Sequence, residues 1–158
     1  MNASVDETWM QHALDLAKKA STLGEVPVGA VVVKQDQIIG VGYNQPIANN
    51  DPTAHAEIIA LREAAKRIGN YRLVDCILYV TLEPCAMCCG AIQHARISTL
   101  VYGAKDTKTG CCGSVVNLMT ETKLNHHTEV RSGILAQACG AQLSEFFKRR
   151  RQQSIFKD

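Results

Sequence analysis

The sequence has no hydrophobic run long enough to cross a membrane. Its longest apolar stretches, such as residues 28–33, fall far short of the ~18 consecutive apolar residues that indicate a membrane span. Residues 1–7 have neither a basic start nor an apolar core, so we expect no secretory signal and a cytoplasmic location. Internal repeats, low-complexity tracts and linkers are also lacking. We therefore expect one domain over residues 1–158 and no membrane partner.

The net charge is too small to indicate a nucleic-acid partner by itself, because the 158 residues carry only +2 at pH 7. The positive charge is concentrated near the end, where residues 145–158 contain five Lys and Arg against two acidic residues. Four of these basic residues are consecutive, at 148–151, and would fan around a helix. We expect one or two of them to reach phosphates.

Seven cysteines are many for this length, and their number is odd. Two of them, Cys85 and Cys88, form a Cys-x-x-Cys pair. In a chain without a secretory signal, this pattern favours metal binding or free thiols over a disulfide framework.

Hydrophobic periodicity and breaker residues predict alternating helices and strands. Asp6 is expected to cap the first helix, and Pro84 to lie in the first turn of a later one. A polar link at 35–37 predicts a hairpin between the first two strands. The expected helices are 6–23, 54–68, 84–94 and 133–151, the strands 28–34, 38–43, 76–82 and 100–104, and the loops 44–53 and 107–113. This order predicts a three-layer α/β domain with a mixed sheet.

Two short motifs at predicted helix starts carry the chemistry. Cys85 and Cys88 are three residues apart, so they share a helix face and can hold one ion, with His55 as a third ligand from the other helix. One imidazole and two thiolates leave the fourth tetrahedral position of zinc open for water, as in catalytic sites. Glu57 lies two residues from His55 and does not share its face, which leaves it available for the water and the substrate.

The same residues allow other interpretations. A structural zinc site would need a fourth ligand, which could come from the candidates Cys76, Cys111, Cys112, His126 or His127. A redox pair would leave the His-x-Glu motif unexplained. Because residues four apart also share a helix face, Cys85 could pair with Cys89 in place of Cys88.

His-x-Glu followed by Pro-Cys-x-x-Cys is the signature of zinc-dependent nucleobase deaminases. Segments 25–30, 51–57, 79–88 and 103–110 resemble bacterial tRNA-specific adenosine deaminases, and the resemblance extends from about Trp9 to Arg151. The Pro-Cys-x-x-Cys spacing of this family favours Cys88 over Cys89. The resemblance implies the cytidine-deaminase-like α/β/α fold, with a five-stranded mixed sheet between helices, in a homodimer with one zinc ion per chain.

The resemblance also implies the reaction and the substrate. Adenosine at the wobble position of a tRNA anticodon becomes inosine, and ammonia is released. Asn44 is expected to face the sugar of the target nucleotide, and the anticodon stem-loop to lie near four residues: Asp106, Lys108, Phe147 and Arg150. Phe146 is expected to pack into the core. Small residues are expected where this chain has Cys89, Cys111 and Cys112.

Two rival functions stay open. A deaminase of free nucleosides or nucleobases, of the cytosine or guanine type, would have the same zinc motif. The basic segment at 145–158 favours an RNA substrate, although a solvated helix end favourable to the helix dipole is its simpler interpretation. A non-catalytic, zinc-stabilised RNA-binding module would hold the metal without needing Glu57.

Overall fold

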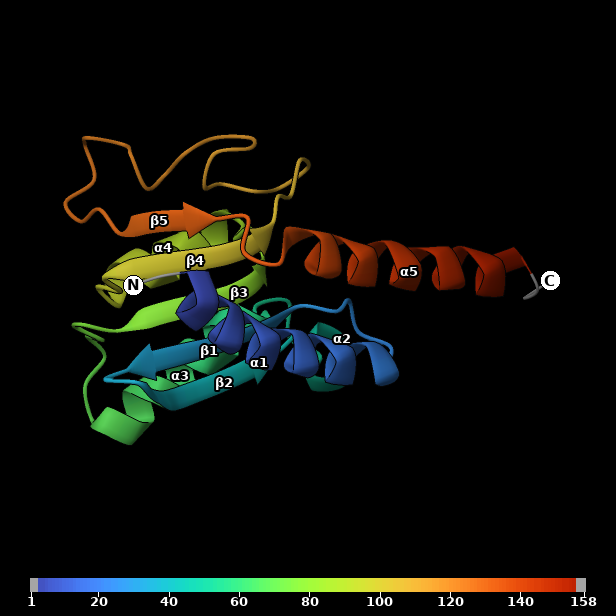
Figure 1. The fold of residues 1–158 in the computed structure, drawn as a ribbon, viewed down its shortest axis with the longest axis horizontal. Helices are drawn as coiled ribbons and strands as arrows, with labels where there is room; N and C mark the ends of the chain where they lie inside the picture. Colours follow the sequence, from blue (N-terminus) through green and yellow to red (C-terminus); the bar gives the residue numbers. More distant parts are fainter. Residues whose placement is uncertain (1–2, 156–158) are drawn as a thin grey trace.

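The computed structural model describes residues 3–155. A five-stranded sheet in the order β2-β1-β3-β4-β5 lies between helices on both faces (Figure 1). The β1 strand pairs antiparallel with β2 and β3, whereas β3, β4 and β5 run parallel to one another. The sheet is therefore mixed, as predicted. The strands are β1 Gly29–Lys34, β2 Gln37–Tyr43, β3 Ile77–Leu82, β4 Thr99–Ala104 and β5 Glu129–Ser132.

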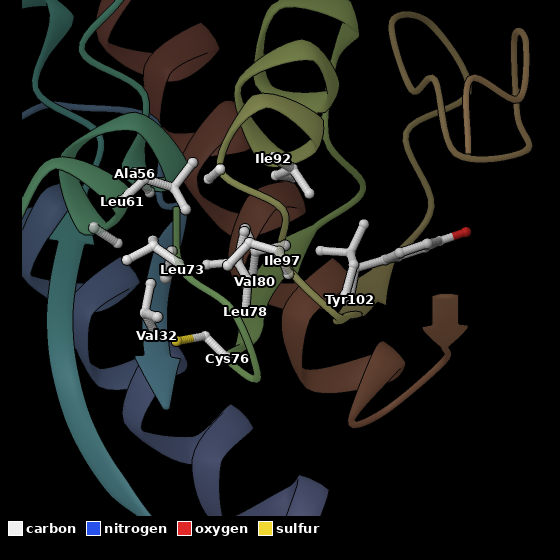
Figure 2. Close-up of a cluster of buried hydrophobic side chains, with 14 of the residues drawn as sticks. Val32, Ala56, Leu61, Leu73, Cys76, Leu78, Val80, Ile92, Ile97 and Tyr102 are labelled. Atoms are coloured by element: carbon white, nitrogen blue, oxygen red, sulfur yellow. The ribbon is translucent and has the colours of Figure 1, made fainter. Parts of the chain in front are cut away.

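The central strands are buried on both faces, which explains their continuous apolar sequences. Val31, Tyr79 and Val101 face the cluster under α1 and α5, whereas Val32 and Val80 face the cluster under α3 and α4. Figure 2 shows part of the second cluster, where side chains of the sheet meet those of α3 and α4. The helices are α1 Ala3–Thr22, α2 Pro46–Asn49, α3 Ala56–Ile68, α4 Ala86–His94 and α5 Ala136–Ile155.

The predicted turns form for the expected reasons. Gln35 and Asp36 link β1 to β2 with φ values of 50° and 60°, a left-handed pair that matches the twist of a tight hairpin. Gly69 ends α3 at φ 72°, where its N–H donates to the carbonyl of Ala65. No helix of residues 3–155 is long and apolar enough to cross a membrane.

The first helix corrects one prediction. It begins at Ala3, before Asp6, so Asp6 is not its N-cap. The Asp6 carboxylate is 3% exposed and accepts hydrogen bonds from the Tyr79 hydroxyl at 2.8 Å and from the Arg131 guanidinium at 3.0 Å. Asp6 therefore joins α1 to β3 and β5.

Other boundaries differ because of local details. The loop predicted at 44–53 contains α2, whose Ile47 and Ala48 amides donate to the buried carboxylate of Glu25. Pro84 precedes the N-cap of α4 instead of lying in its first turn. The strand β5 was not predicted residue by residue, and α5 starts at 136 and continues past 151.

Candidate zinc site and substrate-binding surface

The candidate zinc ligands lie where two helices begin. His55 is the N-cap residue of α3, and Cys85 is the N-cap residue of α4, with Cys88 in its first turn. Asn44 completes the start of α3, because its Oδ1 accepts the Ala56 N–H at 2.9 Å. Both helix N-termini thus face the ligand atoms, and their partial positive charge favours thiolates.

The geometry of the three ligand atoms fits zinc. The Nδ1 of His55 lies 3.6 Å from Cys85 Sγ and 3.5 Å from Cys88 Sγ. Tetrahedral zinc with Zn–N near ~2.0 Å and Zn–S near ~2.3 Å requires an N···S separation of about 3.5 Å. All three ligand atoms lie within 4.8 Å of one another, and no other such group occurs in residues 3–155. The residues present therefore fit one zinc ion with an open fourth position.

The protonation of the two thiols is coupled. Hydrogen bonds from Cys88 and His55 lower the pKa of Cys85 to about 4. The same contact with Cys85, together with burial, raises the pKa of Cys88. A hydrogen bond to Cys85 raises the pKa of His55. One thiolate is thus already favoured, and a divalent cation would displace the second proton on binding.

Glu57 lies in the first turn of α3 beside these ligands. Its side chain is 4% exposed and interacts with the Cys88 thiol. Burial raises the pKa of this carboxyl above its ordinary value. A carboxyl group with a raised pKa is suited to take up and release a proton near neutral pH.

The alternative ligands point elsewhere. Cys89 Sγ lies 3.3 Å from Cys112 Sγ, whereas the group that could hold a metal ion consists of His55, Cys85 and Cys88, which favours Cys88 over Cys89 as the partner of Cys85. Cys76 and Cys111 bond backbone carbonyls, and so do the His126 and His127 rings. Among residues 3–155, none of these supplies a fourth ligand.

The residues expected at the anticodon loop come from two parts of the chain, the segment after β4 and helix α5. Asp106 and Lys108 follow β4, and the Asp106 carboxylate accepts the amides of Lys108 and Thr109 at 3.0 and 3.1 Å. This carboxylate therefore already organises its own turn. Lys108 is exposed.

The second part of the chain is α5. Phe146 is 7% exposed and Phe147 is 40% exposed, as predicted for one packed and one accessible ring. The Arg150 guanidinium lies 5.3 Å from the centre of the Phe146 ring. Arg149 instead donates to Ser21 Oγ at 3.1 Å, with Glu145 nearby at 3.9 Å.

Sequence reasoning missed two buried carboxylates, Glu25 and Glu83, each 2% exposed. Glu25 holds α2, and Glu83 holds the segment after β4 through backbone amides. The available signal was an acidic residue between apolar neighbours, directly before the Pro-Cys motif in the case of Glu83.

Comparison with known families agrees with this site. The model of the cytidine and deoxycytidylate deaminase zinc-binding region matches residues 3–104, a range that contains the His55, Cys85 and Cys88 group. A curated tRNA-specific adenosine deaminase of Haemophilus influenzae is 55% identical over 97% of this chain and 89% of its own. That of Bacillus subtilis is 45% identical, covering 94% and 92%. The chain belongs to the family of tRNA-specific adenosine deaminases.

Solved structures give the same grouping. A deaminase studied for A-to-I editing at the wobble position of transfer RNA is 41% identical, with a TM-score of 0.84 over 86% of this chain and 99% of that one. A guanine deaminase of Nitrosomonas europaea is 27% identical, with a TM-score of 0.74 over 89% and 83%. The fold is therefore shared with enzymes that act on other bases.

Proposed function

We propose that this protein deaminates adenosine to inosine at the wobble position of a tRNA anticodon, with release of ammonia. The observation that carries the proposal is the His-Cys-Cys group with the buried Glu57 beside it, in a chain 55% identical to a tRNA-specific adenosine deaminase. Residues 1–158 would act as one deaminase domain, and a tRNA substrate favours a cytoplasmic location.

The chain's own groups divide the chemistry. His55, Cys85 and Cys88 would hold the zinc ion, which when bound acidifies a coordinated water toward a pKa of ~7. Glu57 would take a proton from the attacking water and deliver it to N1 of adenine while the hydroxide adds to C6. It would then take the proton of the new C6 hydroxyl and give it to the amino group, which leaves as ammonia while the C6 carbonyl of inosine forms. Glu57 can act first as a base and then as an acid because it would lie beside both the attacking water and the adenine ring. Its raised pKa also suits these alternating roles.

Substrate binding would use the residues around this centre. Asn44 would orient the sugar of the target nucleotide, which must leave the loop stack to enter the site. Asp106 and Lys108 after β4, and Phe147 and Arg150 on α5, would contact the anticodon stem-loop. Exposed aromatic rings and basic side chains are the groups that bind bases and phosphates.

We also infer a homodimer. Met87 on α4 and Val115 and Val116 after β4 are exposed apolar residues, at 37%, 53% and 49%. A contiguous apolar patch marks an interaction surface, whereas singly exposed apolar residues do not, so the homodimer would need these three side chains to form one patch. Sedimentation equilibrium of the zinc-loaded protein would measure the association, and a strict monomer at micromolar concentration would contradict it.

The test of function compares substrates directly. The zinc-loaded protein is given an anticodon stem-loop RNA, free adenosine, free cytidine and free guanine, and the deaminated product of each is measured. We expect inosine from the stem-loop far above any other product. Preferred deamination of guanine or cytidine would favour the rival enzyme class, and tight RNA binding without any product would favour a non-catalytic module.

A further inference from the structure

The carboxylate of Glu83 is a fully buried acidic group with no part in holding the metal. It follows the last residue of β3 and lies two residues before Cys85. Its Oε1 accepts the Asp106 N–H at 3.1 Å and the Ser114 hydroxyl. Its Oε2 accepts the N–H groups of Cys112 and Ser114 at 3.0 and 3.1 Å. Both oxygens are thus bonded to the segment 106–114.

The segment 106–114 is closely fitted around this carboxylate. The Cys111 N–H donates to the Pro84 carbonyl at 2.9 Å, next to the Glu83 bonds. A Cβ at Gly110 would lie 2.4 Å from Glu83 Cδ and 2.5 Å from the Asp106 carbonyl oxygen. Only glycine therefore permits this approach without displacement of the carboxylate or the backbone.

We infer that Glu83 is a positioning residue for the RNA substrate. It fixes the segment 106–114, which carries Asp106 and Lys108, against the start of α4. Because only Pro84 separates Glu83 from Cys85, and proline fixes its own φ, the segment is held in a set position relative to the zinc ligands. This inference rests on the proposed function, in which Asp106 and Lys108 contact the stem-loop.

The arrangement requires a carboxylate and not merely a polar side chain. A glutamine has one acceptor oxygen and an NH₂ group that can only donate. Each Glu83 oxygen accepts from a backbone N–H, of Asp106 or of Cys112 and Ser114, and backbone amides cannot turn away. In Glu83→Gln, the NH₂ group must therefore face at least one backbone donor, and the segment loses its fixed position without any change in side-chain size.

The expected effect is on substrate binding. If the binding-competent arrangement of 106–114 falls to about a tenth of the molecules, the apparent affinity for the stem-loop falls about tenfold. The KM for the stem-loop should therefore rise about tenfold in Glu83→Gln, while kcat changes much less and zinc content stays at one per chain. Hydrogen exchange should accelerate at the amides of Asp106, Cys112 and Ser114.

Asp6→Asn is the matched control. It is also an acid-to-amide change at a buried carboxylate, but Asp6 bonds Tyr79 and Arg131 on the face of the sheet opposite α4. It should lower thermal stability without raising KM or exposing the amides of 106–114. An equal rise of KM in Asp6→Asn would overturn the inference, because general destabilisation would then explain the effect.

A second variant perturbs the same contact from its other side. Gly110→Ala should displace the segment from Glu83, and the double variant with Glu83→Gln should have nearly the same KM as the worse single variant. The positioning role would be overturned if the two substitutions raised KM by factors that multiply in the double variant. It would also be overturned if hydrogen exchange at the amides of 106–114 became faster while KM stayed unchanged. If wild-type protein produced no inosine from the stem-loop, the proposed function would fail independently of this inference. Unchanged hydrogen exchange at the amides of 106–114 in Glu83→Gln would show that Glu83 does not fix this segment.

Discussion

Replacing Arg150 with glutamine removes one exposed positive charge from α5 at little cost to the fold. Its guanidinium lies over the Phe146 ring, at 5.3 Å, and Arg150 is exposed. The Phe146 ring beneath it is only 7% exposed, so we expect its packing to depend little on this charge. The substitution therefore tests whether this charge binds RNA phosphate.

The magnitude follows from counterion release. One phosphate contact contributes ~0.7 to ~0.9 to the slope of log affinity against log salt. Over a fourfold rise in salt, from about 50 to about 200 mM, one contact corresponds to roughly a threefold change in affinity. Across this range, the fold-loss of affinity for the stem-loop should thus be about three times larger in wild-type protein than in Arg150→Gln.

Fluorescence anisotropy with a labelled stem-loop over a salt series measures this slope. Arg149→Gln is the matched control, since the Arg149 guanidinium is already bonded to Ser21 and lies near Glu145. We expect its slope to stay closer to wild type. If Arg150→Gln keeps the full wild-type slope, Arg150 does not contact phosphate, and α5 ends in a solvated basic turn.

Three further variants test the site and the fold. Glu57→Ala should keep its zinc and lose at least ~10²-fold in rate, the usual scale for a positioned acid–base group. Normal activity at normal zinc content would show that Glu57 is not the proton carrier. Burial raises the pKa of Tyr79, so the folded state holds the phenol proton more tightly than the unfolded state. This contribution is complete below pH ~10 and declines above it. Raising the pH above ~10 should therefore lower the free energy of unfolding, measured with urea, more in wild-type protein than in Tyr79→Phe. Equal losses of unfolding free energy in the two proteins would contradict the assignment. Asp106→Asn should narrow the preference for RNA over DNA of the same sequence. The Lys108 and Thr109 amides hold Oδ1, so in asparagine the NH₂ group would replace Oδ2, and it cannot accept a hydrogen bond from the ribose 2′-hydroxyl. An unchanged preference ratio would count against this role.

Features set by short-range spacing were predictable from the sequence. The Cys85–Cys88 spacing and the His55–Glu57 spacing lie within single helix starts, so local geometry alone brings the pairs to the right positions. The buried strands were found because their apolar runs are continuous. The strand β5 was missed because it has four residues, none of them fully buried, and so carries little pattern.

Features set by distant partners were not predictable. Asp6 has the character of a helix cap, but its partner Arg131 is 125 residues away, and only the folded sheet brings the two together. Glu25 and Glu83 bond backbone amides, which every residue possesses. No residue type elsewhere in the sequence could therefore indicate a partner for either carboxylate.

These two carboxylates indicate how one fold serves different substrates. Glu25 fixes α2, which follows Asn44, and Glu83 fixes the segment that carries Asp106 and Lys108. Each holds a loop beside the metal ligands through backbone bonds, so side chains on that loop can change while its position is kept. The guanine deaminase with a TM-score of 0.74 at 27% identity has a similar fold. Substitutions on these two loops should therefore change the selectivity for the base and for RNA. Substitution of a metal ligand, His55, Cys85 or Cys88, should instead abolish deamination of every base.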